Sequence, residues 1–266
     1  MSSAIELIAL DVDGTLLNDA HELTPVTEAA IHSAAVQGVK VVIATGKTRH
    51  SAQWILERLA LTTPGVFAQG LVICDPEGNI LHETVLDPDI VGAVLATLQD
   101  MAIPVIAYRD MGLTASAWSP AADALIGFHE PTPKIVDSMP LDSINKLILM
   151  DDPDRLQEVR AILAGVLNGS ATLVQSLPQF LEVVPAGSSK GAGLAWLLDY
   201  LDIPPVHVLA IGDGENDAEM LRLAGIGAAV ENAMQAAREA ADIIIPSNNE
   251  DGVAAAIRRY VIGITG

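Results

Sequence analysis

Short apolar runs alternate with longer helical patterns near the start of the chain. Residues 5–12 and 39–44 are apolar runs, whereas residues 25–37, with Pro25 at the start and Gly38 just past the end, and residues 49–60 are predicted to be helices. The runs do not alternate between apolar and polar residues, which favours strands buried on both faces. Because each strand is followed by a helix, the pattern predicts a parallel sheet with right-handed crossovers.

The same rhythm returns in the last third of the chain. Helices are predicted over residues 190–200, 217–224, 232–241 and 251–260, with strands at residues 206–211, 226–230 and 243–245. Thr24 and Asn232 each precede a predicted helix, and their side chains can accept a hydrogen bond from its first turn. The two ends of the chain therefore predict one doubly wound α/β domain.

The pattern changes between these two halves. It predicts strands near residues 104–107, 113–116 and 146–150, helices at residues 90–101 and 154–167, and an irregular connection at residues 131–140. A chain of 266 residues is long enough for two domains. We therefore predict a core formed by residues 1–80 and 186–266 and an inserted α+β domain formed by residues 81–185.

The composition indicates a water-soluble protein. Hydrophobic residues make up 50% of the chain, yet none of the apolar stretches approaches the roughly 20 residues of a membrane-spanning helix. The first residues have neither the basic start nor the small-residue cleavage site of a signal peptide, which favours the cytoplasm. Because Cys74 is the only cysteine, an intrachain disulfide is excluded.

The net charge of the chain limits the partners that it is expected to bind. A formal net charge of -20 would repel nucleic acid and anionic membrane surfaces, which are polyanions, so neither is expected as a partner. An anionic small molecule would need locally placed cations. We expect a small-molecule ligand and a monomer or small homo-oligomer.

Candidate chemistry begins directly after the first predicted strand, at Asp11-Val12-Asp13-Gly14-Thr15. Acids at positions i and i+2 of an extended chain point to the same side, and a glycine permits the turn that follows. Taken alone, this segment could also be a turn with two solvated acids.

Three further segments stand at the ends of predicted strands or at the start of the next helix. They are Thr45-Gly46-Lys47, Lys190 after two serines, and Gly212-Asp213-Gly214-Glu215-Asn216-Asp217. The first offers a hydroxyl and backbone N–H groups that suit a phosphate oxygen, and the last offers the oxygen ligands that Mg²⁺ prefers. Taken singly, the first could be an ordinary connection between a strand and a helix, the second a surface lysine, and the third an acidic loop that caps a helix. Ligands of open parallel sheets bind at this edge, so the combination predicts one site.

In this order the segments DVDGTLL, ATGKTR, EVVPAGSSKGAGL and GDGENDAEML resemble the four motifs of the haloacid dehalogenase-like (HAD) superfamily, and more narrowly of its Cof-type phosphatases. The resemblance covers essentially the whole chain. It implies a Rossmann-like core, with the inserted domain as a C2-type cap, and phosphate-ester hydrolysis that depends on Mg²⁺.

The resemblance also implies residue roles. Asp11 would be the nucleophile and Asp13 the general acid and base. Mg²⁺ would be held by Asp11, the backbone carbonyl of Asp13 and Asp213, with Asp217 in support. The expected phosphate-binding residues are Thr45, Gly46, Lys190 and Asn216.

The chain departs from the family pattern at two places. Lys47, with Arg49 close by, stands where relatives commonly carry arginine, and Gln69-Gly70 stands where Asn-Gly is frequent. Both changes concern substrate contacts and cap docking rather than the four motifs. Besides Lys47 and Arg49, the candidates for substrate contacts are Arg109, Trp118, His129 and Gln179.

Two other functions remain open. A phosphosugar mutase would use the same core, but it needs a second anion site, for which the inserted domain offers Arg109, Lys134, Lys146, Arg155 and Arg160. A receiver-like phosphate-sensing module would also place acids, a threonine and a lysine at strand ends. Such a module would not need an inserted domain of about this size. Hydrolysis of a sugar phosphate or a similar metabolite is therefore favoured.

Overall fold

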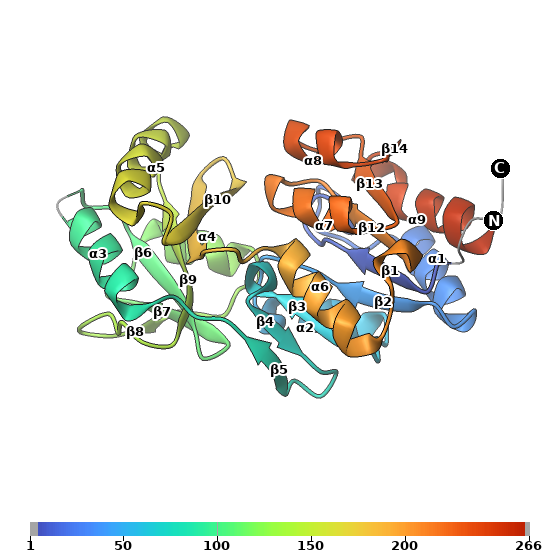
Figure 1. Ribbon diagram of the computed structural model, residues 1–266, viewed down its shortest axis with the longest axis horizontal. Helices are drawn as coiled ribbons and strands as arrows, with labels where there is room; N and C mark the ends of the chain where they lie inside the picture. Colours follow the sequence, from blue (N-terminus) through green and yellow to red (C-terminus); the bar gives the residue numbers. More distant parts are fainter. Residues whose placement is uncertain (1–4, 100, 264–266) are drawn as a thin grey trace. The chain divides into compact units, whose positions relative to one another are not determined.

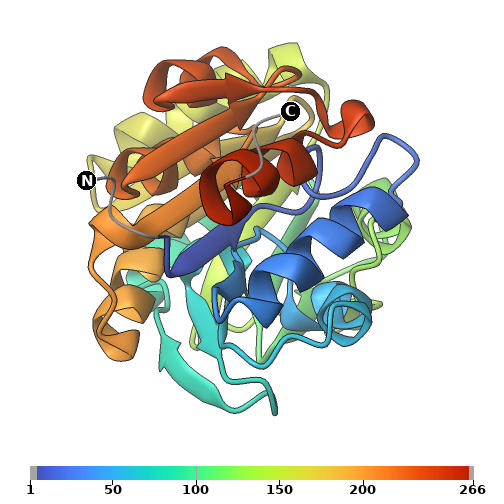
Figure 2. The same ribbon diagram turned by 90° about the vertical axis from the view of Figure 1, so that its right-hand side faces the viewer.

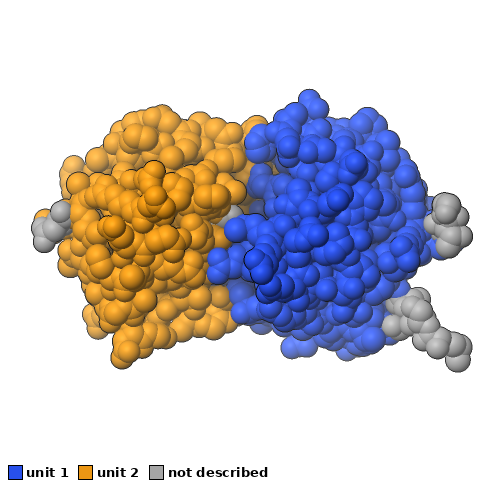
Figure 3. Space-filling view, turned by 90° about the horizontal axis from the view of Figure 1, so that it is seen from above, with its two compact units in different colours: residues 1–46, 54–81, 189–266 blue, residues 47–53, 82–188 orange. Residues whose placement is uncertain are grey.

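The computed structural model describes residues 5–99 and 101–263, which divide into two compact units (Figure 3). The first unit contains the described parts of residues 1–46, 54–81 and 189–266. The second contains residues 47–53 and the described parts of residues 82–188. The segment at residues 47–53 therefore groups with the second unit, although the chain around it belongs to the first.

The first unit is built on a parallel sheet in the strand order β14-β13-β12-β1-β2 (Figure 1). Its strands are β1 (Leu7–Leu10), β2 (Lys40–Ile43), β12 (Val208–Gly212), β13 (Ile226–Val230) and β14 (Ile243–Ile245). All four residues of β1 are fully buried, as the unbroken apolar run predicts. Leu10 pairs with Ile43 on one side and Ile211 on the other, so three neighbouring strands end at the same edge.

Helices form two groups around this sheet. The first group is α6 (Lys190–Leu201), α7 (Ala218–Leu223) and α8 (Gln235–Ala240), and the second is α1 (Pro25–Val36) and α9 (Gly252–Ile257). Helix α6 packs on α7, which packs on α8, while α1 packs on α9, as Figure 2 shows in blue and red. Right-handed crossovers in opposite directions along the sheet place the groups on opposite faces. The predicted doubly wound α/β core is confirmed.

Local signals explain the start of α1. The Thr24 side chain accepts a hydrogen bond of 3.1 Å from the backbone N–H of Thr27, and Pro25 takes the first helical position, where no N–H is needed. Gly38 has φ +86° just past the end, a conformation that glycine adopts without strain. Helix α2 (Arg49–Arg58) also follows the sequence pattern.

Asn232 does not cap the helix as predicted. Helix α8 begins at Gln235, and its N-cap residue is Met234, which makes no side-chain cap hydrogen bond. The Asn232 side chain instead donates to the Gly14 carbonyl at 2.8 Å and accepts from the Asn248 N–H at 3.0 Å. Contacts with distant segments outweigh the local capping preference.

A small sheet with the order β3-β4-β5 was missed by the sequence pattern. Its residues up to Leu81 belong to the first unit, and His82 and Glu83 belong to the second. Its strands are β3 (Gly65–Phe67), β4 (Val72–Cys74) and β5 (Ile80–Glu83). The remaining one-turn helices are η1 (Ala68–Gly70), η2 (Pro205–His207), η3 (Glu215–Asp217), η4 (Asn248–Glu250) and the π-helical η5 (Arg258–Ile262).

The second unit is an α+β fold with the strand order β10-β11-β9-β6-β7-β8. Its strands are β6 (Val105–Arg109), β7 (Gly112–Ala115), β8 (Lys134–Ile135), β9 (Ile144–Met150), β10 (Ala171–Leu177) and β11 (Phe180–Pro185). Its helices are α3 (Pro88–Gln99), α4 (Pro120–Gly127) and α5 (Pro153–Leu167). The pairs are antiparallel except β7 with β8. The hairpin β6-β7 was predicted, whereas α4 and the hairpin β10-β11 were missed.

The apolar core of the second unit lies between α3, α5 and one face of this sheet. Leu147 and Leu149 of β9 and Leu181 and Val183 of β11 are buried on that face. Because side chains alternate along a strand, Lys146 and Glu182 point to the other face. That face therefore contains buried charged side chains as well as apolar ones such as Ile148 and Phe180.

The described residues 5–99 and 101–263 include no helix with both the length and the apolar character to cross a membrane.

Candidate active site

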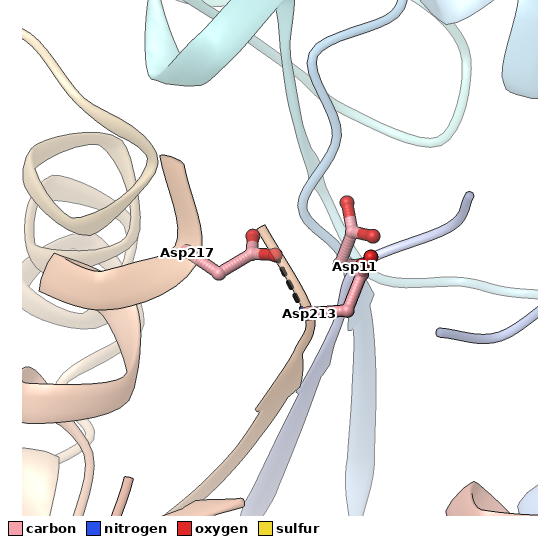
Figure 4. A group of neighbouring side chains, drawn as sticks. All are labelled: Asp11, Asp213 and Asp217. Carbon is pink, nitrogen blue, oxygen red and sulfur yellow. Dashed lines mark hydrogen bonds between the residues drawn. The ribbon is translucent and has the colours of Figure 1, made fainter. Parts of the chain in front are cut away.

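Side chains from distant segments converge where β1 and β12 end. Asp11 follows β1 directly, Asp213 follows β12, and Asp217 lies at the end of η3, as Figure 4 shows. One carboxylate oxygen from each of the three lies within 4.8 Å of the others. The parallel pairing of β1 with β12 explains the convergence, since it brings two strand ends to one edge.

Lys190, the first residue of α6, joins this cluster. Its Nζ donates to Asp11 Oδ1 at 2.5 Å and to Asp217 Oδ1 at 2.7 Å, and the residue is 1% exposed. Burial disfavours the charged amine, but the carboxylates of Asp11 and Asp217 raise the pKa of Lys190 above its ordinary value. Lys190 is therefore a buried, protonated cation rather than a solvated surface lysine.

Asp217 uses both carboxylate oxygens inside the cluster. Oδ1 accepts from Lys190, and Oδ2 accepts from the backbone N–H groups of Asp213 and Gly214, each at 2.9 Å. The carboxylate thereby links the start of α6 to the turn after β12. Because both of its carboxylate oxygens already accept hydrogen bonds, Asp217 is better suited to orienting its neighbours than to binding an ion itself.

Asp213 is held from the other side by Thr15, whose hydroxyl donates to Asp213 Oδ1 at 2.8 Å. Burial, with the charges of Asp11 and Asp217, raises the pKa of Asp213 to about 9 in spite of this hydrogen bond. The cluster holds three carboxylates and a single lysine, so it is short of positive charge.

The carboxylates fit a hard divalent cation. Mg²⁺ prefers oxygen ligands and takes few of them from protein carboxylates. Asp11 and Asp213 offer such oxygens, and a bound cation would offset the repulsion that raises the pKa of Asp213.

Asp13 lies in the turn after Asp11, where it forms a bridge with Leu17. Its carboxylate is partly exposed and lies 3.8 Å from the ring of His21. Gly14 has φ +80°, and a Cβ there would lie 2.6 Å from Asp213 Oδ2. Only glycine lets the turn pass this closely to the acidic cluster.

The segment after β2 lies beside the turn of η1. The Thr45 N–H donates to the Val66 carbonyl at 2.9 Å, and the Thr45 carbonyl accepts from the Gln69 N–H at 3.1 Å. The Gln69 side chain accepts from Asn216 Nδ2 at 3.0 Å and lies against Gly46. Thr45, Gly46 and Asn216 are thus held around one glutamine in the first unit.

The six candidates for substrate contacts all belong to the second unit and lie in separate surroundings. Lys47 stacks over the Phe128 ring, Arg49 donates to Gln53, and Trp118 donates to Asp123. Arg109 pairs with Asp110 and Asp142. His129 donates its N–H to Ile126, and the Gln179 carbonyl accepts from Asp151.

Residues 8–257 match the family model of the haloacid dehalogenase-like hydrolases. The chain belongs to this family. It is 34% identical to an HMP-PP phosphatase of Cronobacter sakazakii, across 85% of this chain and 84% of that protein. It is also 37% identical, across 95% of its length, to a protein of Arabidopsis thaliana named endoribonuclease YBEY, chloroplastic. It spans only 46% of that relative.

Solved structures of the family have the same fold. A haloacid dehalogenase-like hydrolase of B. subtilis superposes with a TM-score of 0.87 at 26% identity, across 97% of this chain and 100% of that one. A second, from Bacteroides thetaiotaomicron, gives a TM-score of 0.85 at 27% identity, across 96% and 99%. The predicted family, and with it a hydrolase, is confirmed.

The sequence reasoning missed two side chains at the site. Thr15 was quoted within the first motif but given no role, although a hydroxyl two residues after Asp13 could have been expected to reach a neighbouring acid. Gln69 was noted only as a departure from the family pattern. Its contact with Asn216 joins residues 147 positions apart, and no local pattern indicates such a contact.

Proposed function

We propose that this hydrolase is a Mg²⁺-dependent phosphatase that releases phosphate from small organic phosphate esters through an aspartyl-phosphate on Asp11. The observation that supports it most is the contact of Lys190 Nζ with Asp11 Oδ1 at 2.5 Å, inside a cluster with two further carboxylates. Among the described residues no second donor contacts Asp11, so one carboxylate oxygen is held while the other can attack phosphorus.

Asp11 would form the bond to phosphorus while the bond to the ester oxygen breaks. Asp13, two residues further along the chain and partly exposed, would give its proton to the leaving alcohol. It would then take a proton from the water that hydrolyses the aspartyl-phosphate and restores Asp11. Splitting the reaction in this way requires one acid that stays ionised and one that exchanges protons.

Asp11, Asp213 and the backbone carbonyl of Asp13 would hold the cation. When bound, Mg²⁺ supplies positive charge that screens the phosphate from the carboxylate that attacks it. Thr15 and Asp217 would keep Asp213 and its backbone in place, since both hydrogen-bond to it.

Thr45, the N–H of Gly46, Lys190 and Asn216 would bind the non-bridging phosphate oxygens. Fixed donors of this kind stabilise the charge of a phosphoryl transition state. The positive charge of Lys190 matters most because the chain as a whole carries a net charge of -20.

The second unit would act as the cap that selects the leaving group. The six candidates for substrate contacts belong to it, and one relative is named as an HMP-PP phosphatase. We propose phosphorylated metabolites such as sugar phosphates as the substrate class. A cytoplasmic location, and the absence of nucleic acid and membrane partners, remain predictions from composition.

Four of the five basic residues that could form a second anion site already have partners, which favours hydrolysis over a phosphosugar mutase. Lys146 contacts Glu182, Arg109 contacts Asp142, and Arg155 contacts Asp151. Arg160 donates to the Leu173 carbonyl. Cations that already have partners in their own unit are poor candidates for a second phosphate site.

The test is release of phosphate from p-nitrophenyl phosphate with and without Mg²⁺. Asp11→Asn keeps the shape of the side chain but removes the nucleophile, so we expect kcat to fall at least about 10³-fold. Asp199→Asn, on the exposed face of α6, is the matched control and keeps wild-type kcat. Turnover by Asp11→Asn close to the wild-type value, or turnover without any divalent cation, would rule the mechanism out.

A further inference from the structure

The turn at residues 68–70 has an unusual backbone. Ala68, Gln69 and Gly70 have φ values of +50°, +64° and +89° in succession. The left-handed region disfavours residues with a Cβ, and two of these three carry one. Unfavourable backbone conformations of this kind are found where the surrounding structure requires them, often at functional sites.

This turn packs against two segments of the candidate active site through its backbone. The Gln69 N–H donates to the Thr45 carbonyl at 3.1 Å. A Cβ on Gly70 would lie 2.1 Å from the Ser189 carbonyl, immediately before Lys190. The left-handed turn therefore lies between the segment after β2 and the start of α6.

The Gln69 side chain contacts two further residues of the site. It is 2% exposed, and its Oε1 accepts from Asn216 Nδ2 at 3.0 Å. A Cβ on Gly46 would lie 2.7 Å from Gln69 Nε2, so the amide lies against the Gly46 backbone. One glutamine thus touches both Gly46 and Asn216, which come from opposite ends of the sequence.

The direction of the bond to Asn216 has a chemical consequence. An amide nitrogen carries two hydrogens, and Gln69 accepts only one of those on Asn216 Nδ2. The bond fixes the Asn216 amide so that the nitrogen, rather than the oxygen, faces Gln69. The second hydrogen then remains for an anion bound beside Gly46, whereas a flipped amide would present an oxygen that repels it.

We propose that Gln69 is a positioning residue for phosphate binding: its amide orients Asn216 and fixes Gly46 so that both donate to the same phosphoryl group. This proposal rests on the proposed function, because it assigns the anion to that site. Gln69 acts through its neighbours and is not itself a catalytic residue. The left-handed backbone at Gln69 is what directs the side chain between Gly46 and Asn216.

A double-mutant cycle tests this assignment. The variants are Gln69→Ala, Asn216→Ala and the double variant, measured for kcat and KM with p-nitrophenyl phosphate and for binding of inorganic phosphate in the presence of Mg²⁺ by calorimetry. We expect each single variant to lower kcat/KM about 10- to 100-fold, and the double variant to match Asn216→Ala within about threefold, because coupled residues are not additive. If the two losses multiply instead, Gln69 does not act through Asn216.

Two further variants separate positioning from folding. Gln69→Gly also lacks the amide but adopts φ +64° without strain, so it should melt at a higher temperature than Gln69→Ala and lose the same activity. Gln37→Ala, at an exposed glutamine, is the control and keeps wild-type kcat/KM. Recovery of activity in Gln69→Gly would show that the backbone, not the amide, is what matters.

Phosphate binding distinguishes the failure of this proposal from failure of the proposed function. A wild-type protein that binds inorganic phosphate but does not turn over the ester would overturn the proposed function, and the cycle would still be measured on binding. Binding in which Gln69→Ala equals wild type overturns the positioning role whatever the turnover. Absence of phosphate binding by the wild-type protein overturns both.

Discussion

Each unit buries a lysine against carboxylates, and the two arrangements differ in charge balance. In the first unit Lys190 contacts Asp11 and Asp217, with Asp213 beside them. In the second unit Lys146 contacts Glu182 at 2.7 Å, and its Nζ lies 4.1 Å from the centre of the Tyr108 ring. Both lysines are 1% exposed.

In the second unit, the buried carboxylates of Glu182 and Glu130 each have their own hydrogen-bond donors. Glu182 pairs with Lys146, and Glu130 accepts from the Thr48 N–H, the Thr48 hydroxyl and the Tyr108 hydroxyl, at 3.0, 2.6 and 3.0 Å. In the first unit three carboxylates converge on one lysine and raise the pKa of Asp213 to about 9. Among the described residues, Asp11, Asp213 and Asp217 form the only group of three acidic side chains close enough together to hold a metal ion.

A buried ion pair alone therefore does not indicate a catalytic site. A pair that balances its charge and hydrogen bonds can serve the fold only, and apolar residues can often replace it. Carboxylates that crowd together beyond the charge available to them are unfavourable unless a cation binds.

The largest effect is expected from changing the two lysines separately. Lys190→Met removes the cation that faces the nucleophile, so kcat should fall about 10³-fold or more. In contrast, Lys146→Met combined with Glu182→Leu replaces a whole ion pair by apolar side chains, and its free energy of unfolding should be unchanged or higher. Its kcat with p-nitrophenyl phosphate should stay near wild type. Steady-state kinetics measure kcat, and urea unfolding measures the free energy of unfolding. Similar losses of kcat in the two variants would show that the two buried lysines do not differ in function.

Magnesium should stabilise only the first arrangement. At 100 times its Kd, a cation that binds the native state alone adds about 2.7 kcal/mol to the free energy of unfolding. We expect the melting temperature to rise with Mg²⁺ and to fall again with a chelator. Asp213→Asn should abolish this rise, whereas the exposed Asp199→Asn should retain it. A rise that persists in Asp213→Asn would place the cation elsewhere.

The smallest effect concerns Glu130 and the pH. Burial raises the pKa of Glu130 above its ordinary 4.5, outweighing the hydrogen bonds from Thr48. Its native state therefore binds the proton more tightly than the unfolded state, and this contribution to stability is complete below pH 4.5 and is lost as the pH rises through the raised pKa. Glu130→Gln cannot ionise, so wild type should lose stability relative to it over this rise in pH. The free energies of unfolding of the two proteins are measured over this pH range. If they change with pH in parallel, the raised pKa of Glu130 is contradicted.

Much of the core and of its site could be predicted because the signals are local. The buried strands, the helix that starts after Thr24, and the acids at the ends of β1 and β12 depend on neighbours within a few positions. A parallel sheet then aligns strand ends without further information. The segment at Asp11 and Asp13 was recognisable for this reason.

The predictions for the second unit were poorer for the opposite reason. Lys146 was considered for a second anion site, but its partner Glu182 lies 36 positions away on another strand. The hairpin β10-β11 and helix α4 were also missed. In the first unit, Asn232 was assigned a local role that distant contacts replace. For Lys146 and Asn232 the deciding neighbour is remote in the sequence.

The alternation of strands and helices could be predicted from the sequence because period and spacing are properties of adjacent positions. The resemblance to the HAD superfamily rests on four short motifs, which are also local. The folded protein adds that Lys190 is buried between Asp11 and Asp217, that Lys146 is balanced by Glu182, and that Gln69 joins Gly46 to Asn216. Burial and charge balance are set by which distant segments pack together, and those pairings arise only when the chain folds.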